Sequence, residues 1–333
     1  MVIDEFADLD ELWSRILARD RRSLAKAITL VESQRDDHRR LADSLLERVA
    51  LHGASAERVG ISGVPGAGKS TFIETLGLRL IDQGHRVAVL AVDPSSRLSG
   101  GSILGDKTRM PRLSAAAEAF IRPSPAAGTL GGVARRTREA MLLCEAAGFD
   151  VVLVETVGVG QSEHAVYDLV DSFLLLALAG AGDELQGIKR GILELVDVVC
   201  INKADGDNEE RATRACAETK AALRLLRGQD CPEVFAVSAL TGAGVGDAWN
   251  ALQAHHARAR ASGALETRRA RQRGQWLDRL LEDGLRGALA AHPTAAARLA
   301  TLRREVEAGK RSPSAAAREV LEAFLPGSAD SED

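Results

Sequence analysis

The stretch Gly63-Val64-Pro65-Gly66-Ala67-Gly68-Lys69-Ser70-Thr71 decides the fold of this chain. Apolar residues 59–61 precede it and residues 72–76 continue it in a helical pattern, so it reads as strand, glycine-rich turn and helix. The spacing of Gly, four residues and Gly-Lys-Ser predicts a loop whose N–H groups bind phosphate at a helix N-terminus. We expect Lys69 to contact the β- and γ-phosphates and the Ser70 hydroxyl to bind Mg²⁺. Every residue of the stretch is therefore a candidate nucleotide ligand.

Composition narrows the class of protein. The 333 residues are 45% hydrophobic and 27% charged, which favours one large α/β domain with smaller additions. The formal net charge is -4 without a long basic stripe, so we expect no nucleic-acid partner. The cysteines form no Cys-x-x-Cys pair, the N-terminus is acidic, and no apolar segment reaches the length of a membrane span. These features predict a cytoplasmic protein with no membrane partner.

The apolar pattern divides the chain into three predicted regions. Residues 1–53 show helical periodicity and form an N-terminal helical arm, while residues 54–262 alternate short apolar runs with helical stretches. Because most of these runs do not alternate, we expect strands buried on both faces of a doubly wound, mainly parallel sheet, with helices on both faces and ligand at the strands' carboxyl ends. The expected strands are residues 59–61, 87–92, 151–154, 173–176, 196–201 and 234–237, and the clearest crossover helices are residues 135–147 and 209–226.

Residues 263–333 form the third region, predicted to be helical with a disordered acidic tail. The run Arg268-Arg269-Ala270-Arg271-Gln272-Arg273 is interpreted as a solvated helix face. Beyond it lies an apolar stripe that so small a region cannot bury alone, so we expect it to pack on the main domain or on a second subunit. The stripe consists of Trp276, Leu277, Leu280, Leu281 and Leu285.

A second motif identifies the base. Asn202-Lys203-Ala204-Asp205 directly follows the expected strand 196–201. An aspartate there can accept hydrogen bonds from guanine N1–H and the 2-amino group, which adenine does not offer, so the motif predicts guanine nucleotides. We expect Asn202 to brace the loop and the Lys203 stem to cover the ring. Ser238-Ala239-Leu240, after the expected strand 234–237, resembles the GTPase loop that contacts guanine O6 through a backbone N–H.

Acidic residues at two other strand ends are candidates for holding Mg²⁺. Asp93 ends the run 87–92, and Glu155 ends the run 151–154. The string Glu155-Thr156-Val157-Gly158 stands where GTPases usually carry Asp-x-x-Gly, whose glycine N–H senses the γ-phosphate. Because Glu is one methylene longer than Asp, its contact with Mg²⁺ could run through water or be partly replaced by Asp93 or Asp106.

Val159 stands where Ras-like enzymes have the glutamine that orients the attacking water. An aliphatic side chain cannot orient water, so we predict GTP hydrolysis that is slow alone and stimulated by a partner. Either Gln161 or a partner residue could then supply the missing group.

Four longer strings resemble the MeaB/ArgK family: AVDPSS at 91–96, GGSILGDKTRM at 100–110, ETVGVGQSE at 155–163 and GAGDELQGIK at 180–189. Members of this family are P-loop GTPase chaperones of adenosylcobalamin-dependent methylmalonyl-CoA mutase. The resemblance implies a GTPase cycle that gates cofactor delivery to the mutase and protects it, and a homodimer joined through C-terminal helices. It places Asp106 in a first switch, Glu155 in a second and Lys189 in a third mobile segment that contacts the mutase. With Lys69, these three are the catalytic candidates.

Three alternatives stay open. A nickel-insertion GTPase of the same superfamily would need thiolate or imidazole clusters, whereas the pair His255-His256 is interpreted as a solvated helix face. A transport-linked ATPase or kinase for basic amino acids would not need the guanine-reading Asp205. A non-hydrolysing nucleotide-dependent scaffold is the third; against it, none of Lys69, Ser70, Asp93 and Glu155 is missing, so slow hydrolysis is expected. No cobalamin-binding Asp-x-His-x-x-Gly string is present, so we do not expect the chain to carry that cofactor, and which acyl-CoA mutase it serves stays open.

Overall fold

The structure is a computed structural model that describes residues 8–33, 35–92, 109–124, 130–156, 162–179, 190–228 and 231–325. It divides into two compact units, Met1–Arg269 and Ala270–Asp333. Six residues named above for the nucleotide site lie outside the described residues: Asp93, Asp106, Gly158, Val159, Gln161 and Lys189.

The described part of the first unit is built on a seven-stranded sheet in the order β3-β2-β4-β1-β5-β6-β7. Every neighbouring pair is parallel, which confirms the predicted doubly wound architecture. In the centre, Ile61 of β1 pairs with Glu155 of β4, and Gly63 pairs with Leu176 of β5. The strands are β1 (Glu57–Gly63), β2 (Val87–Val92), β3 (Ala119–Ser124), β4 (Val151–Thr156), β5 (Ser172–Leu178), β6 (Val198–Asn202) and β7 (Glu233–Ala236).

One described strand was not expected from the sequence, and most of the others differ from their expected bounds by one or two residues. The edge strand β3 was not predicted, because it contains Arg122 and Pro123; proline is tolerated at a sheet edge, where its missing N–H is not needed. Strand β6 begins at Val198 rather than at residue 196. The intervening Asp197 has another role, since its carboxylate accepts a hydrogen bond of 2.8 Å from the Phe173 N–H.

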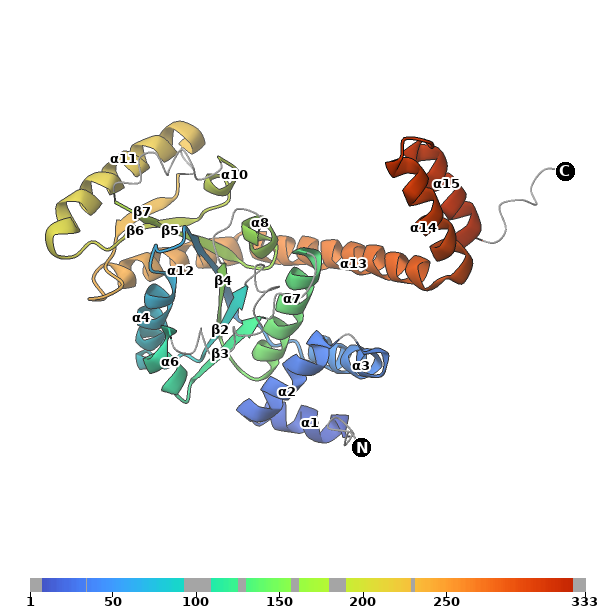
Figure 1. Ribbon diagram of the computed structural model, residues 1–333. Coiled ribbons are helices and arrows are strands. Elements are labelled where there is room, and N and C mark those ends of the chain that lie inside the picture. The colour runs from blue at the N-terminus through green and yellow to red at the C-terminus, as the bar shows by residue number, and fades with distance from the viewer. Residues whose placement is uncertain are drawn as a thin grey trace. The chain divides into compact units, whose positions relative to one another are not determined.

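Helices cover both faces of the sheet (Figure 1) and bury a separate apolar core on each. One core includes residues of α4 (Lys69–Asp82), α6 (Pro111–Ala115) and α12 (Val245–Ala261). The other includes residues of α7 (Leu130–Ala146), α8 (Ser162–Tyr167), α10 (Arg190–Leu193) and α11 (Glu209–Arg227). Because both faces are covered, the central strands are apolar at nearly every position.

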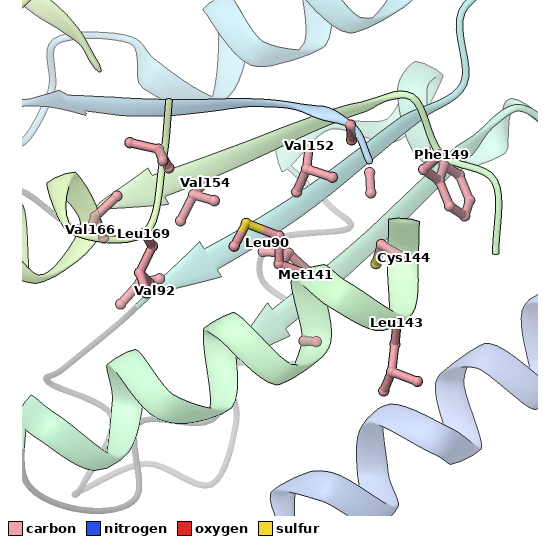
Figure 2. Packing of buried hydrophobic residues seen from close by; sticks show 14 of the residues in the cluster. Leu90, Val92, Met141, Leu143, Cys144, Phe149, Val152, Val154, Val166 and Leu169 are labelled. Carbon is pink, nitrogen blue, oxygen red and sulfur yellow. The ribbon is translucent and has the colours of Figure 1, made fainter. Parts of the chain in front are cut away.

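Helix α7 contributes to the second core and also contacts the N-terminal arm. Figure 2 shows Met141 and Cys144 beside Leu90 and Val152 of the sheet, whereas Leu143 points away from the sheet, toward the arm. The arm consists of α1 (Leu9–Leu17), α2 (Arg21–Glu32) and α3 (Asp36–His52). Its apolar faces are buried in the same core.

The arginine run 268–273 is not uniformly solvated, which corrects the interpretation made above. The guanidinium of Arg269 donates to Asp171 Oδ1 at 2.8 Å and Oδ2 at 2.5 Å, and its side chain is only 15% exposed. Arg268 donates to the Tyr167 carbonyl at 3.2 Å and lies 4.3 Å above the centre of that ring. Of the four arginines in the run, the later two, Arg271 and Arg273, are exposed.

Helix α13 (Ala264–Ala291) continues from the first unit into the second, which also contains α14 (Pro293–Glu307) and α15 (Pro313–Phe324). Leu302, Ala316 and Val320 form a small buried cluster, and Glu319 pairs with Arg298 and Arg311. No helix in the described part of the chain is long and apolar enough to cross a membrane.

Candidate nucleotide-binding site

The glycine-rich loop leaves β1 at Gly63 and enters α4 at Lys69. A Cβ atom at Gly63 would lie 2.3 Å from the Leu176 carbonyl oxygen. A Cβ atom at Gly68 would lie 2.6 Å from Asn202 Nδ2, and the φ of Gly68 is 89°, in the left-handed region. Glycine at these two positions is therefore required by space, and at Gly68 also by conformation. The loop ends at the α4 N-terminus, where unpaired N–H groups and the helix dipole favour an anion.

Lys69 is buried against the loop that it closes. Its Nζ donates to the Gly63 carbonyl at 2.7 Å and to the Val64 carbonyl at 3.2 Å. Burial lowers the pKa of Lys69, and the nearby carboxylates of Glu155 and Glu163 partly offset this effect. The ammonium group is thus held against the main-chain carbonyls of the glycine-rich loop.

The structure brings the side chains of Ser70 and Glu155 together. Ser70 Oγ donates to Glu155 Oε1 at 3.2 Å, and both side chains stand at the phosphate-loop edge of the sheet. The next residue, Thr156, donates from Oγ1 to Ser62 Oγ at 2.9 Å, and both of these side chains are buried. A hydroxyl and a carboxylate are ligands that suit Mg²⁺, so this pair fits the ion.

Asn202 joins the phosphate loop to the loop that follows β7. Its Nδ2 donates to the Ala67 carbonyl at 2.7 Å, and its Oδ1 accepts from the Ala239 N–H at 3.0 Å. The side chain is buried, so both of its polar ends use protein partners. Asn202 thus contacts both loops, through residues that lie 135 and 37 positions away along the chain.

The remaining guanine-motif residues cluster beyond Asn202. Ser238 Oγ donates to Asp205 Oδ2 at 2.5 Å and accepts from the Thr241 N–H at 3.1 Å. Lys203 and Leu240 are exposed, so both side chains are accessible to a ligand. In this structure the Ala239 N–H donates to Asn202, so a guanine O6 would have to share that donor or use a neighbouring one.

Three side chains of this site lie outside the motifs quoted from the sequence: Ser62, Thr75 and Asn208. Thr75 Oγ1 donates to the Ala239 carbonyl at 2.6 Å, and Asn208 Nδ2 donates to the Lys203 carbonyl at 2.7 Å. Thr75 and its partner lie 164 residues apart, so no local sequence signal connects them. Asn208 is closer to its partner but lies outside the four-residue motif.

No group of three or more His, Cys, Asp or Glu side chains able to hold a metal ion occurs among the residues that the structure describes. The predicted pair His255-His256 lies at the other end of the strands. His255 Nε2 is 3.4 Å from Asp197 Oδ1, and its Nδ1 is 3.4 Å from Ser172 Oγ. These contacts make His255 part of a polar cluster rather than of a fully solvated face.

Comparisons with known proteins agree with this geometry. Residues 24–294 match the family described as methylmalonyl Co-A mutase-associated GTPase MeaB. A probable GTPase of Mycobacterium tuberculosis is 50% identical over 94% of both chains. The mouse protein named methylmalonic aciduria type A homolog, mitochondrial, is 47% identical over 95% of this chain and 79% of its own length. The crystal structure of a protein named LAO/AO transport system kinase is similar with a TM-score of 0.74 and 38% identity, covering 97% of this chain and 99% of that one.

Proposed function

The chain belongs to the family of methylmalonyl-CoA mutase-associated GTPases, and we propose that its GTPase cycle gates adenosylcobalamin delivery to an acyl-CoA mutase and protects that enzyme. Methylmalonyl-CoA mutase is the favoured partner, because the family is named for its association with that enzyme. The observation that carries the nucleotide-binding part of the proposal is the pair of contacts from Asn202, which connects the phosphate loop to the Ala239 loop.

At the phosphate end, Lys69 offsets the negative charge of the β- and γ-phosphates, and the N-terminus of α4 binds their oxygens. Ser70 and Glu155 are the described residues that would hold Mg²⁺, which when bound neutralises charge that develops on the phosphates. Asp93, Asp106, Gly158 and Lys189 remain proposed contributors from outside the described residues.

At the base end, Asp205 selects guanine and Lys203 covers the ring. Ser238 supports this assignment because its hydroxyl holds one Asp205 carboxylate oxygen, which limits the rotation of the carboxylate. The other carboxylate oxygen of Asp205 is then already held in one orientation when guanine binds.

We propose that hydrolysis is slow without a partner, because Val159 cannot orient the attacking water. The proposed partners are the mutase and a second copy of this chain, in the cytoplasm. Exposed Leu277, Leu281 and Leu285 support a homodimer, since they repeat every four residues along α13 and form an apolar stripe on that helix. We retain three functional regions, the arm 1–53, the GTPase domain 54–262 and the dimerisation region 263–333.

Nucleotide turnover by the purified protein tests the proposal. We expect hydrolysis of GTP in preference to ATP, and a higher rate of GTP hydrolysis when methylmalonyl-CoA mutase is added. Asp205→Asn should lose the preference for GTP and gain affinity for XTP, because an amide can donate to the 2-oxo group of xanthine. A preference for ATP would overturn the guanine assignment and favour a kinase, the activity for which the similar crystallised protein is named. Unchanged GTP turnover with the mutase present would overturn the proposed partner.

A further inference from the structure

Thr75 and Asn208 lie outside both guanine motifs, yet each side chain donates to a main-chain carbonyl within one of them. We infer that these two side chains are positioning residues that set the affinity of the site for guanine and its preference over adenine. The inference rests on the proposed function, because it assigns their role at the proposed guanine site.

Thr75 fixes the loop that follows β7. Its hydroxyl donates to the Ala239 carbonyl at 2.6 Å, and the Ala239 N–H donates to Asn202 Oδ1 at 3.0 Å. Both polar main-chain atoms of Ala239 are therefore held by side chains from other elements. Since a peptide group is planar, the Ala239 carbonyl and the Leu240 N–H share one plane, and Thr75 also sets the direction of that N–H. This is the loop expected to contact guanine O6.

Asn208 fixes the other side of the proposed base site. Its Nδ2 donates to the Lys203 carbonyl at 2.7 Å, while the N–H of Ala204 donates to the Val237 carbonyl at 3.0 Å. These two atoms belong to one peptide group, which is thus held at both ends. Lys203 has a φ of 61°, a conformation that a side-chain-bearing residue adopts at a cost. The bond from Asn208 helps to hold this unfavourable backbone conformation.

The two bonds have the same consequence for a ligand. The peptide between Lys203 and Ala204 lies one residue before Asp205, and the peptide after Ala239 leads into Leu240. Both recognition loops are therefore held by protein contacts before guanine binds. A loop without its brace must be ordered by the ligand, and this ordering weakens binding. The phosphate loop keeps its own contacts through Gly63, Val64 and Lys69. The loss of binding affinity should therefore come from the contacts with the base.

The test compares GDP with ADP, using displacement of a fluorescent guanine nucleotide from the full-length protein. Thr75→Val keeps the shape of the side chain and removes the hydroxyl, whereas Thr75→Ser keeps the hydroxyl. We expect the valine variant to bind GDP about threefold to tenfold more weakly, the effect of one net hydrogen bond, and the serine variant to bind like wild type. Asn208→Leu should reproduce the valine result, while Asn250→Ala, on the exposed side of α12, should change nothing.

The ratio of the two affinities separates positioning from general damage to the fold. If Thr75 and Asn208 act on the base, ADP affinity stays within about twofold of wild type and the preference for GDP narrows by the factor lost for GDP. An equal loss for GDP and ADP, or GDP binding by both variants that equals wild type, would overturn the inference. Wild-type protein that binds ADP as well as GDP would overturn the proposed function itself, so the two failures are distinguishable.

Discussion

Replacing Arg269 by methionine should destabilise the first unit severely, although the residue belongs to a run that reads as surface. In the structure its guanidinium makes two hydrogen bonds to Asp171, one of 2.5 Å to Ser55 Oγ and one of 2.6 Å to the Ala56 carbonyl. The Asp171 side chain is fully buried, and without Arg269 it would keep the hydrogen bond of 3.0 Å from the Arg58 N–H. Removing one member of a buried ion pair costs about 3–5 kcal/mol, because the other charge stays buried without compensation.

Urea unfolding followed by tryptophan fluorescence measures this cost, with Trp249 buried in the first unit. The matched control is Arg271→Met, two positions along the same run, where the exposed side chain should change the free energy of unfolding by less than about 0.5 kcal/mol. Adding Asp171→Asn to the Arg269 variant should cost less than the sum of the single changes, because the charge left unpaired has been removed. Equal stability of the Arg269 and Arg271 variants would refute the reasoning and restore the solvated-face interpretation.

Three other changes test separate parts of the structure. Gly68→Ala should weaken GDP binding by at least about tenfold, because the new Cβ would lie 2.6 Å from Asn202 Nδ2. Gly53→Ala is the control and should leave GDP binding unchanged, because its Cβ would meet nothing within 4 Å. Burial raises the pKa of Glu57 to about 7. The unfolded chain therefore loses this proton before the folded state does, and the folded state loses roughly 3 kcal/mol of stability as pH rises from about 4.5 to 7. In urea titrations, Glu57→Gln should be more stable than wild type at pH 8 but not at pH 4.5. Glu155→Gln should raise the Mg²⁺ concentration for half-maximal GTP hydrolysis by about tenfold to a hundredfold, and an unchanged Mg²⁺ titration would remove Glu155 from the metal site.

Much of the fold is predictable because its signals are local. The glycine-rich loop requires a strand before it and a helix after it, and continuous apolar runs indicate strands covered on both faces. The strand β3 was missed because it lacks such a continuous apolar run. Its position at the edge of the sheet permits the arginine and proline that interrupt the pattern. Such a segment becomes a strand because of its position in the sheet, and the local sequence does not contain that information.

The motif residues of the site can be predicted from the sequence, whereas the side chains that hold the motif loops in place are much harder to predict. Lys69, Ser70 and Asn202 could be proposed from sequence because the chemistry of phosphate and guanine selects the residue types, and the structure places all three beside the glycine-rich loop or Glu155. Thr75 and Arg269 are common residue types in helices, and their roles depend on partners 164 and 98 residues away. A charged run on a helix is indistinguishable from a solvated face until the structure brings a buried carboxylate against it.

The two contacts of Asn202 affect how the parts of a nucleotide act together. One buried amide connects the Ala67 and Ala239 loops. When a ligand binds at the phosphate end of the site, the base end is therefore already in position. Guanosine and pyrophosphate added as separate molecules would each lose their own translational freedom, whereas GDP loses it once. The intact nucleotide should therefore bind more tightly than the product of the two fragment affinities, as a bivalent ligand does through effective concentration.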